Sequence, residues 1–209
     1  MPSFDLTFVP GAAGLGSFWD PIRQQLPSAW RTRSFDLPGL GPVPPRAEVQ
    51  SYLQLTDHVA RAIDRRTVLI GQSMGGYVSL ELTLRYPQLV SHLVLAVAAA
   101  GVDMARHGTF DWRPAARLEK PNQAAWTFAP VADLSAELHR ITVPVLLIWA
   151  TRDRISPLGV AEQLAAQLPR ARLVTFDSDD HWVARARAAE TAQAIRKYLL
   201  ENAEPERVG

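Results

Sequence analysis

Short apolar runs alternate along this chain with longer segments in which apolar residues recur every three or four positions. The short runs are rich in β-branched residues, which is typical of strands buried inside a sheet, whereas the longer spacing is typical of helices that cover one. Strands are predicted at residues 4–9, 33–37, 67–70, 93–97, 143–149 and 173–176. Strands that alternate with helices predict an α/β fold: an open, doubly wound, mainly parallel sheet of about six strands.

The helices between these strands are predicted from the same spacing, and their ends from capping residues. Helices are predicted at residues 18–26, 49–63, 74–86, 157–168 and 184–200. Ser156 is expected to cap the helix that starts at Pro157, because a hydroxyl satisfies the first free N–H groups and proline is favoured at the first helical position. The polar tail from Glu201 is expected to fray.

Residues 101–140 interrupt this alternation, since 40 residues separate two strands that need only one helix between them. A connection of that length inside a compact domain is usually functional. We predict one domain, residues 1–209, with residues 101–140 inserted as a small cap or lid. Ser17, Phe18 and Trp19 could border a substrate pocket or belong to the core. Four aromatic side chains are candidates for the pocket wall: Trp112, Trp126, Phe128 and Trp182. The first three lie in the insertion, where they could instead pack inside the lid.

Composition narrows the choice of partners. Hydrophobic residues make up 47% of the 209 residues and charged residues 21%, with a formal net charge of +1, so neither nucleic acid nor a membrane surface is expected as a partner. The chain has no cysteine, which excludes disulfides, thiolate catalysis and cysteine-ligated metals. No signal peptide is visible, and the longest apolar run, residues 93–100, is too short to span a bilayer. We expect a cytoplasmic protein that acts on a small molecule without metal or cofactor.

The candidate chemistry centres on Gly71-Gln72-Ser73-Met74-Gly75, which lies between the predicted strand at 67–70 and the predicted helix at 74–86. A strand, a Gly-x-Ser-x-Gly turn and a helix form a nucleophile elbow, whose tight turn strains the serine backbone and raises its Oγ above the sheet. Strand and helix nearly touch there, which requires small residues two positions before and after the serine. The helix N-terminus also places positive partial charge where an oxyanion would form. Ser73 is therefore the candidate nucleophile.

A serine nucleophile needs a base and an orienting acid, and candidates for both follow later strands. Asp153 comes after the predicted strand at 143–149, and His181 comes after the last predicted strand. The carboxyl ends of parallel strands share one edge of a sheet, so both side chains are expected on the edge where Ser73 projects. Asp103, after the strand that follows the elbow, is an alternative acid. None of the other histidines has a triad position: His58, His92, His107 and His139.

Two further motifs carry a resemblance to a known family. Val9-Pro10-Gly11-Ala12 resembles the His-Gly-x oxyanion loop of the α/β-hydrolase superfamily, and Asp36-Leu37-Pro38-Gly39-Leu40-Gly41 resembles its Asp-x-Pro-Gly-x-Gly turn. Together with the elbow, they make the chain resemble this superfamily across nearly its whole length. Two departures stand out: Pro10 replaces the usual histidine, and the chain begins at what resembles the third strand of the family, so the core lacks the first antiparallel strands.

The resemblance implies a mechanism as well as a fold. It implies nucleophilic attack by Ser73, proton transfer by His181 and control of the histidine tautomer by Asp153. It also implies an oxyanion hole made by the backbone N–H groups of Ala12 and Met74. No cofactor and no metal is implied for these roles.

Three functions are compatible with these residues. The leading hypothesis is a cofactor-independent serine hydrolase that cleaves a small carboxylic ester or thioester through an acyl-enzyme. The first alternative is a C–C bond hydrolase or lyase that uses the same triad on a small anionic substrate, with Arg106 and Arg113 close enough in sequence to bind the anion. The second alternative is a non-catalytic, ligand-binding member of the fold.

Overall fold

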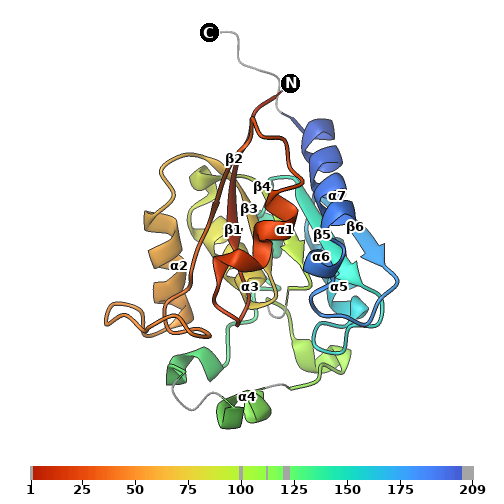
Figure 1. The fold of residues 1–209 in the computed structure, drawn as a ribbon. Coiled ribbons are helices and arrows are strands. Elements are labelled where there is room, and N and C mark those ends of the chain that lie inside the picture. The colour runs from red at the N-terminus through yellow and green to blue at the C-terminus, as the bar shows by residue number, and fades with distance from the viewer. Residues whose placement is uncertain (1, 99–100, 112, 120–122, 204–209) are drawn as a thin grey trace.

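The computed structural model describes residues 2–98, 101–111, 113–119 and 123–203, in which helices cover both faces of a central sheet (Figure 1). The strands are β1 (Asp5–Val9), β2 (Arg31–Ser34), β3 (Thr67–Gln72), β4 (Val90–Ala96), β5 (Val145–Ala150) and β6 (Ala171–Phe176). The α-helices are α1 (Asp20–Arg23), α2 (Tyr52–Arg61), α3 (Met74–Arg85), α4 (Arg113–Glu119), α5 (Leu158–Gln167), α6 (Val183–Ala186) and α7 (Ala188–Glu201). Short 3-10 helices are η1 (Gly16–Trp19), η2 (Pro87–Leu89), η3 (Met104–His107), η4 (Ala125–Phe128) and η5 (Leu138–Arg140).

Neighbouring strands of the sheet all run parallel, in the order β2-β1-β3-β4-β5-β6. The predicted fold class, a doubly wound α/β fold with a parallel sheet, is confirmed. The order reverses between β1 and β3, because β2 lies on one side of β1 and all later strands lie on the other. Ligands of open α/β sheets bind at the carboxyl ends of the strands beside such a reversal. The loop after β1 and the elbow after β3 meet at this point.

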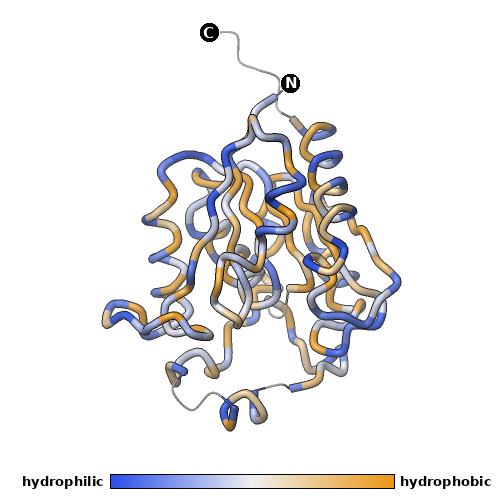
Figure 2. The backbone as a smooth tube through the Cα atoms, in the orientation of Figure 1, coloured by the Kyte–Doolittle hydropathy of each residue, from blue (hydrophilic) through white to orange (hydrophobic). Residues whose placement is uncertain are grey.

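Side chains that alternate along each buried strand supply both faces of the sheet with apolar surface. In β4, Leu93 and Leu95 belong to the core beneath α2, α3 and α5, whereas Val94 and Ala96 belong to the core beneath α1 and α7. Figure 2 shows apolar residues along the central strands and an alternation of polar and apolar residues along α2 and α7. Burial of apolar area, at about 25 cal/mol per Å², is the main force that holds these layers together.

The edge strand β2 is shorter than predicted and begins earlier. It spans Arg31–Ser34 rather than residues 33–37 and pairs with β1. The chain leaves the sheet at this point because Asp36 turns toward the loop after β1, where its Oδ1 accepts a hydrogen bond from the Gly16 N–H at 2.8 Å. The arginines of β2 form ion pairs along the exposed edge, and such charges discourage pairing with another chain.

Two predicted helix boundaries are wrong. The N-cap of α5 is Pro157, and the Ser156 hydroxyl does not cap the helix but donates to the Ala98 carbonyl at 2.7 Å. That tertiary hydrogen bond outweighs the local capping preference. The helix predicted at residues 184–200 is divided into α6 and α7, because Arg187 leaves the helical backbone with φ −109° and ψ 46°.

The remaining helices differ from the prediction mainly in length. The helix predicted at residues 18–26 is a 3-10 turn, η1, followed by the single turn of α1. Helix α7 continues to Glu201, and the rest of the predicted polar tail, beyond residue 203, lies outside the described residues. Among the helices that the structure describes, none combines the length and the apolar character needed to cross a bilayer.

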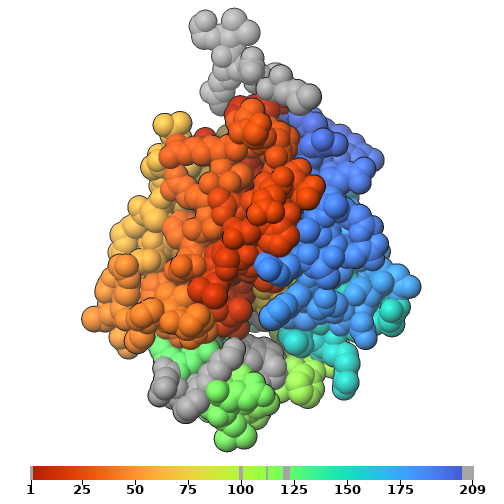
Figure 3. All heavy atoms as spheres, in the orientation of Figure 1, coloured from red at the N-terminus to blue at the C-terminus, as the bar shows by residue number. Residues whose placement is uncertain are grey.

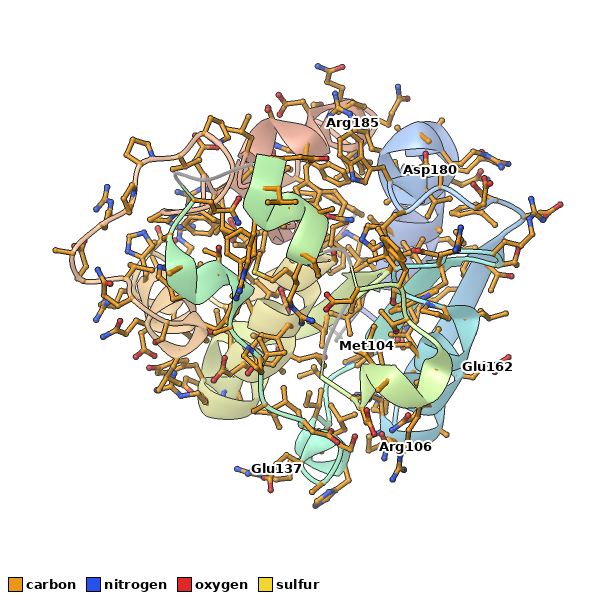
Figure 4. The ribbon with its side chains drawn as sticks, turned by 90° about the horizontal axis from the view of Figure 1, so that it is seen from below. Met104, Arg106, Glu137, Glu162, Asp180 and Arg185 are labelled. Atoms are coloured by element: carbon orange, nitrogen blue, oxygen red, sulfur yellow. The ribbon has the colours of Figure 1, made fainter. Side chains whose placement is uncertain are left out.

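The segment at residues 101–140 lies across the carboxyl ends of the strands, at the bottom of the molecule in Figures 1 and 3. At one end, η3 contacts α5 through a hydrogen bond between His107 Nε2 and Gln163 Oε1 at 2.7 Å. Figure 4 shows this side from below, with Met104 and Arg106 of η3 on the same side of the molecule as Glu162 of α5. Beyond α4, the Tyr52 hydroxyl of α2 donates to the Thr127 carbonyl. The segment is thus attached to α5 at one end and to α2 at the other.

Candidate active site

The turn between β3 and α3 has the geometry of a nucleophile elbow. Ser73 is the N-cap of α3 and has φ 53° and ψ −120°, a combination that L-residues rarely adopt and that clusters at functional sites. A Cβ atom at Gly71 would lie 2.3 Å from the Gly75 carbonyl oxygen, and one at Gly75 would lie 2.3 Å from the Pro10 oxygen. Both contacts are with backbone, which has no room to move, so the close approach of strand, helix and β1 loop requires glycine at both positions.

A continuous line of hydrogen bonds joins three predicted site residues. His181 Nε2 lies 2.8 Å from Ser73 Oγ, and His181 Nδ1 lies 2.6 Å from Asp153 Oδ2. Each side chain comes from a different strand end: Ser73 follows β3, Asp153 follows β5 and His181 follows β6. The side chains of His181 and Asp153 are 13% and 1% exposed, so solvent competes little for these bonds. An imidazole between a carboxylate and a hydroxyl holds its Nδ1 proton toward the acid and its Nε2 lone pair toward the serine.

The other carboxylate oxygen of Asp153, Oδ1, is also hydrogen-bonded. Asp153 Oδ1 accepts hydrogen bonds from the backbone N–H groups of Ile155 at 2.8 Å and Ser156 at 3.1 Å. These bonds fix the plane of the carboxylate so that Oδ2 faces His181. The alternative acid, Asp103, lies elsewhere: its Oδ1 accepts from the Ala105 N–H and its Oδ2 pairs with an arginine side chain on η3. Asp153 is therefore the carboxylate that the fold brings to the histidine.

The two predicted oxyanion donors lie at the same strand ends. The N–H groups of Ala12 and Met74 make no hydrogen bond with any residue that the structure describes, and Met74 begins α3, where the helix presents free N–H groups. The loop that carries Ala12 contains Pro10. Other contacts hold this loop: the Gly14 N–H donates to the Gly11 carbonyl at 2.9 Å, and the Leu37 N–H donates to the Gly14 carbonyl at 2.7 Å.

Comparison with known proteins identifies the family of the chain. A sequence model described as "Alpha/beta hydrolase family" matches residues 8–135, more than half of the chain, and a second, described as "TAP-like protein", matches residues 114–209. The chain belongs to the α/β-hydrolase family.

Several relatives of this α/β-hydrolase are named as esterases. Pimeloyl-[acyl-carrier protein] methyl ester esterase of Aeromonas hydrophila is 35% identical, with 85% of this chain and 88% of the relative covered. The enzyme of the same name from Nitrosomonas europaea is 28% identical, with the same coverage. A solved structure of a hydrolase from Pseudomonas aeruginosa superposes with a TM-score of 0.77 at 25% identity, covering 94% of this chain and 90% of that chain. These relatives support an ester hydrolase of the α/β fold.

A pocket of about 280 Å³ opens directly in front of Ser73 in this α/β-hydrolase. Its walls are mainly apolar, and among the described side chains that line it only His181 and Glu119 can carry charge. Four wall residues come from the segment at 101–140, and the others come from η1, the end of β3 and the loops that follow the strands. The lining residues are Ala12, Ala13, Phe18, Gln72, Ser73, Phe110, Ala115, Ala116, Glu119, Ile155, His181 and Trp182.

The predicted pocket aromatics are only partly in this wall. Trp182 lines the pocket and packs edge-on against Phe18, with ring centroids 6.2 Å apart. Trp126 does not line it, because its indole packs against Tyr52 on α2 with centroids 5.3 Å apart. Phe128 does not line it either, because its ring is buried beneath an arginine of α4. Trp112, the fourth candidate, lies outside the described residues.

Several pocket residues were missed by sequence reasoning. Phe110, Ala115 and Ala116 carry no motif, and only the path of the 101–140 segment brings them above the serine. Ile155 had a usable signal, since it lies two residues after the acid. Among the described residues, no group of three or more histidine, aspartate or glutamate side chains is arranged to hold a metal ion.

Proposed function

We propose that this α/β-hydrolase cleaves small carboxylic esters or thioesters through an acyl-enzyme formed on Ser73. The observation that carries the proposal is the continuous contact from the Asp153 carboxylate through the His181 imidazole to the Ser73 hydroxyl. His181 is the general base in acylation and the general acid for the leaving group, and Asp153 holds its tautomer.

The reaction proceeds in two halves. Ser73 Oγ attacks the ester carbonyl while His181 Nε2 takes its proton, and the resulting oxyanion accepts hydrogen bonds from the N–H groups of Ala12 and Met74. One such donor typically contributes about 3–4 kcal/mol to transition-state stabilisation. The intermediate then expels the alcohol or thiol, which receives the proton from His181. Water, activated by the same imidazole, hydrolyses the acyl-enzyme and restores the serine.

The size and polarity of the pocket support a small, largely apolar acyl group. A volume of about 280 Å³ corresponds to roughly nine water-sized volumes, below the usual range for drug-sized ligands. The two arginines proposed from sequence to bind an anionic substrate pair with carboxylates instead: Arg106 pairs with Asp103, and Arg113 pairs with Asp111. Neither lines the pocket, so the charges near the serine favour a neutral acyl group over an anionic one. The relatives named as methyl ester esterases support an ester with a small alcohol.

We also propose that residues 101–140 act as a small cap on one domain of 209 residues. The support is that Phe110, Ala115, Ala116 and Glu119 all reach the pocket from this segment. Because this segment supplies part of the pocket wall, it can set the acyl-chain preference while the strand ends that carry the catalytic groups stay unchanged.

A chain-length panel tests the proposed function. Purified protein is assayed with p-nitrophenyl esters and matched thioesters from acetyl to dodecanoyl, beside a diketone panel, with Ser73→Ala as the control. We expect turnover of the short esters and thioesters, a steep decline for long chains, and none in the control. Cleavage of a diketone with every ester untouched would replace the proposal with C–C hydrolysis, and lack of any turnover or covalent adduct would replace it with ligand binding.

A further inference from the structure

Gln72, the residue before the candidate nucleophile, has no role in the reaction proposed above, yet it lies at the centre of the site. Its side chain is 3% exposed and forms part of the pocket wall beside Ser73. Its Nε2 donates a hydrogen bond to the backbone carbonyl of His181 at 3.3 Å. A buried amide normally satisfies its polar atoms with specific partners, so this contact indicates a fixed position for the side chain.

The other end of the same amide packs against the loop after β1. A Cβ atom built on Gly11 would lie 2.3 Å from Gln72 Oε1 and 3.3 Å from its Cδ. The amide therefore occupies the space that any side chain at position 11 would need. Gly11 directly precedes Ala12, a predicted oxyanion donor. Gln72 thus spans the gap between the loop with the oxyanion donor and the loop with the base.

The loop around His181 has few other ties to the nucleophile strand. Within the loop, the Asp180 N–H donates to Ser178 Oγ and the Trp182 N–H donates to Asp180 Oδ1, which shape the loop locally. Among the hydrogen bonds between described residues, the one from Gln72 is the bond that joins the His181 backbone to β3. The position of the imidazole relative to Ser73 depends on this bond, in addition to the contacts of the imidazole itself.

We propose that Gln72 is a positioning residue, which sets the distance between the His181 loop and the oxyanion loop and so aligns the imidazole with Ser73 Oγ. This inference rests on the proposed function, because alignment matters only if His181 moves the serine proton. Small misplacements of reacting groups are costly: an error of about 1 Å can reduce rate about 100-fold. Loss of one hydrogen bond with the loop otherwise in place is expected to reduce it about tenfold.

The test uses two variants of the full chain and a matched control. Gln72→Met keeps the length of the side chain but removes the donor. Gln72→Glu keeps the shape but places an acceptor and a negative charge against the backbone carbonyl of His181. Gln193→Met makes the same change on the exposed face of α7, away from the site. For each protein we would measure the pH profile of fluorophosphonate labelling, kcat and KM for p-nitrophenyl acetate, and the thermal midpoint.

A positioning role predicts a distinct set of results. In Gln72→Met, labelling rate and kcat fall about tenfold while KM stays constant. In Gln72→Glu, the acid limb of the labelling profile moves up by about one pH unit, because a nearby negative charge favours the protonated imidazole. The control matches the unchanged protein. If the thermal midpoint shows that Gln72→Met folds poorly, the shift of the acid limb in the labelling profile of Gln72→Glu still tests the inference.

Other results would overturn the inference. Any one of three results would show that Gln72 only fills space in the pocket wall. These are labelling of Gln72→Met at the unchanged rate, a rise in KM alone in that variant, or an unmoved acid limb in Gln72→Glu. Ser73→Ala, run in the same series, separates this failure from that of the proposed function. If Ser73→Ala is labelled normally, the nucleophile assignment fails; if Ser73→Ala is silent and Gln72→Met is normal, only the role of Gln72 fails.

Discussion

Replacing Asp153 with asparagine is expected to abolish turnover while leaving the fold intact, for a reason that the hydrogen bonds of this side chain define. The N–H groups of Ile155 and Ser156 both point at Oδ1, at 2.8 and 3.1 Å. In the variant these two donors require the amide oxygen at that place. The amide NH₂ group must then occupy the place of Oδ2, which lies 2.6 Å from His181 Nδ1.

An NH₂ group can only donate, so it forces His181 Nδ1 to act as an acceptor. The ring proton then moves to Nε2, which faces Ser73 Oγ at 2.8 Å and can no longer accept the serine proton. The equivalent change in serine proteases lowers kcat about 10⁴-fold, or about 5 kcal/mol in the activation barrier, and we expect a loss of that order here. Because the Asp153 side chain is 1% exposed, water cannot readily replace it as a hydrogen-bond partner of the imidazole.

The assay is kcat for p-nitrophenyl acetate, with the thermal midpoint as a check on folding. Asp103→Asn is the matched control, because Asp103 caps η3 and does not contact His181. We expect the control to retain turnover. A kcat of Asp153→Asn within tenfold of the unchanged protein would refute the tautomer argument, and an equal loss in Asp103→Asn would refute the choice of acid.

Three further predictions concern stability. Gly71→Ala is expected to lose about 1–3 kcal/mol in urea unfolding together with most turnover, because its Cβ would lie 2.3 Å from the Gly75 oxygen; an unchanged urea midpoint would show that the elbow is looser than described. Ser156→Ala is expected to lose about 1–3 kcal/mol, since the buried Ala98 carbonyl loses its 2.7 Å hydrogen bond, and an unaltered midpoint would argue against that bond. Burial raises the pKa of Glu81 above its ordinary value of 4.5, so stability associated with its neutral form is present below that value and is lost as pH rises through the raised pKa. Glu81→Gln should therefore melt at a higher temperature than the unchanged protein above neutral pH and at the same temperature below about pH 4, and a difference that is constant with pH would contradict this.

The parts of the fold that sequence could predict are those with strong local patterns. The β-branched run before Gly71 marks a central strand because a parallel strand buried on both faces must be apolar throughout. The elbow could also be predicted from local sequence, because its two glycines are required by a close contact between elements that are neighbours along the chain. Asp153 and His181 could be placed because the carboxyl ends of parallel strands meet at one edge.

The parts that could not be predicted depend on contacts between distant residues. Ser156 satisfies the local rule for a helix cap, but its hydroxyl bonds to Ala98, 58 residues away, because that carbonyl is buried and needs a donor. Trp126 and Phe128 are large aromatic residues of the kind that line pockets. They do not line this pocket, because Trp126 packs against α2 and Phe128 packs against α4. Phe110 lines the pocket although nothing in its surroundings along the chain distinguishes it from a surface aromatic residue.

The most direct test of the account is the site of covalent labelling by a fluorophosphonate, determined by intact mass and peptide mapping. We expect a single adduct per chain on the peptide that contains Ser73, no adduct in Ser73→Ala, and slow labelling in His181→Ala. An adduct on any other residue, or equal labelling of Ser73→Ala, would contradict it.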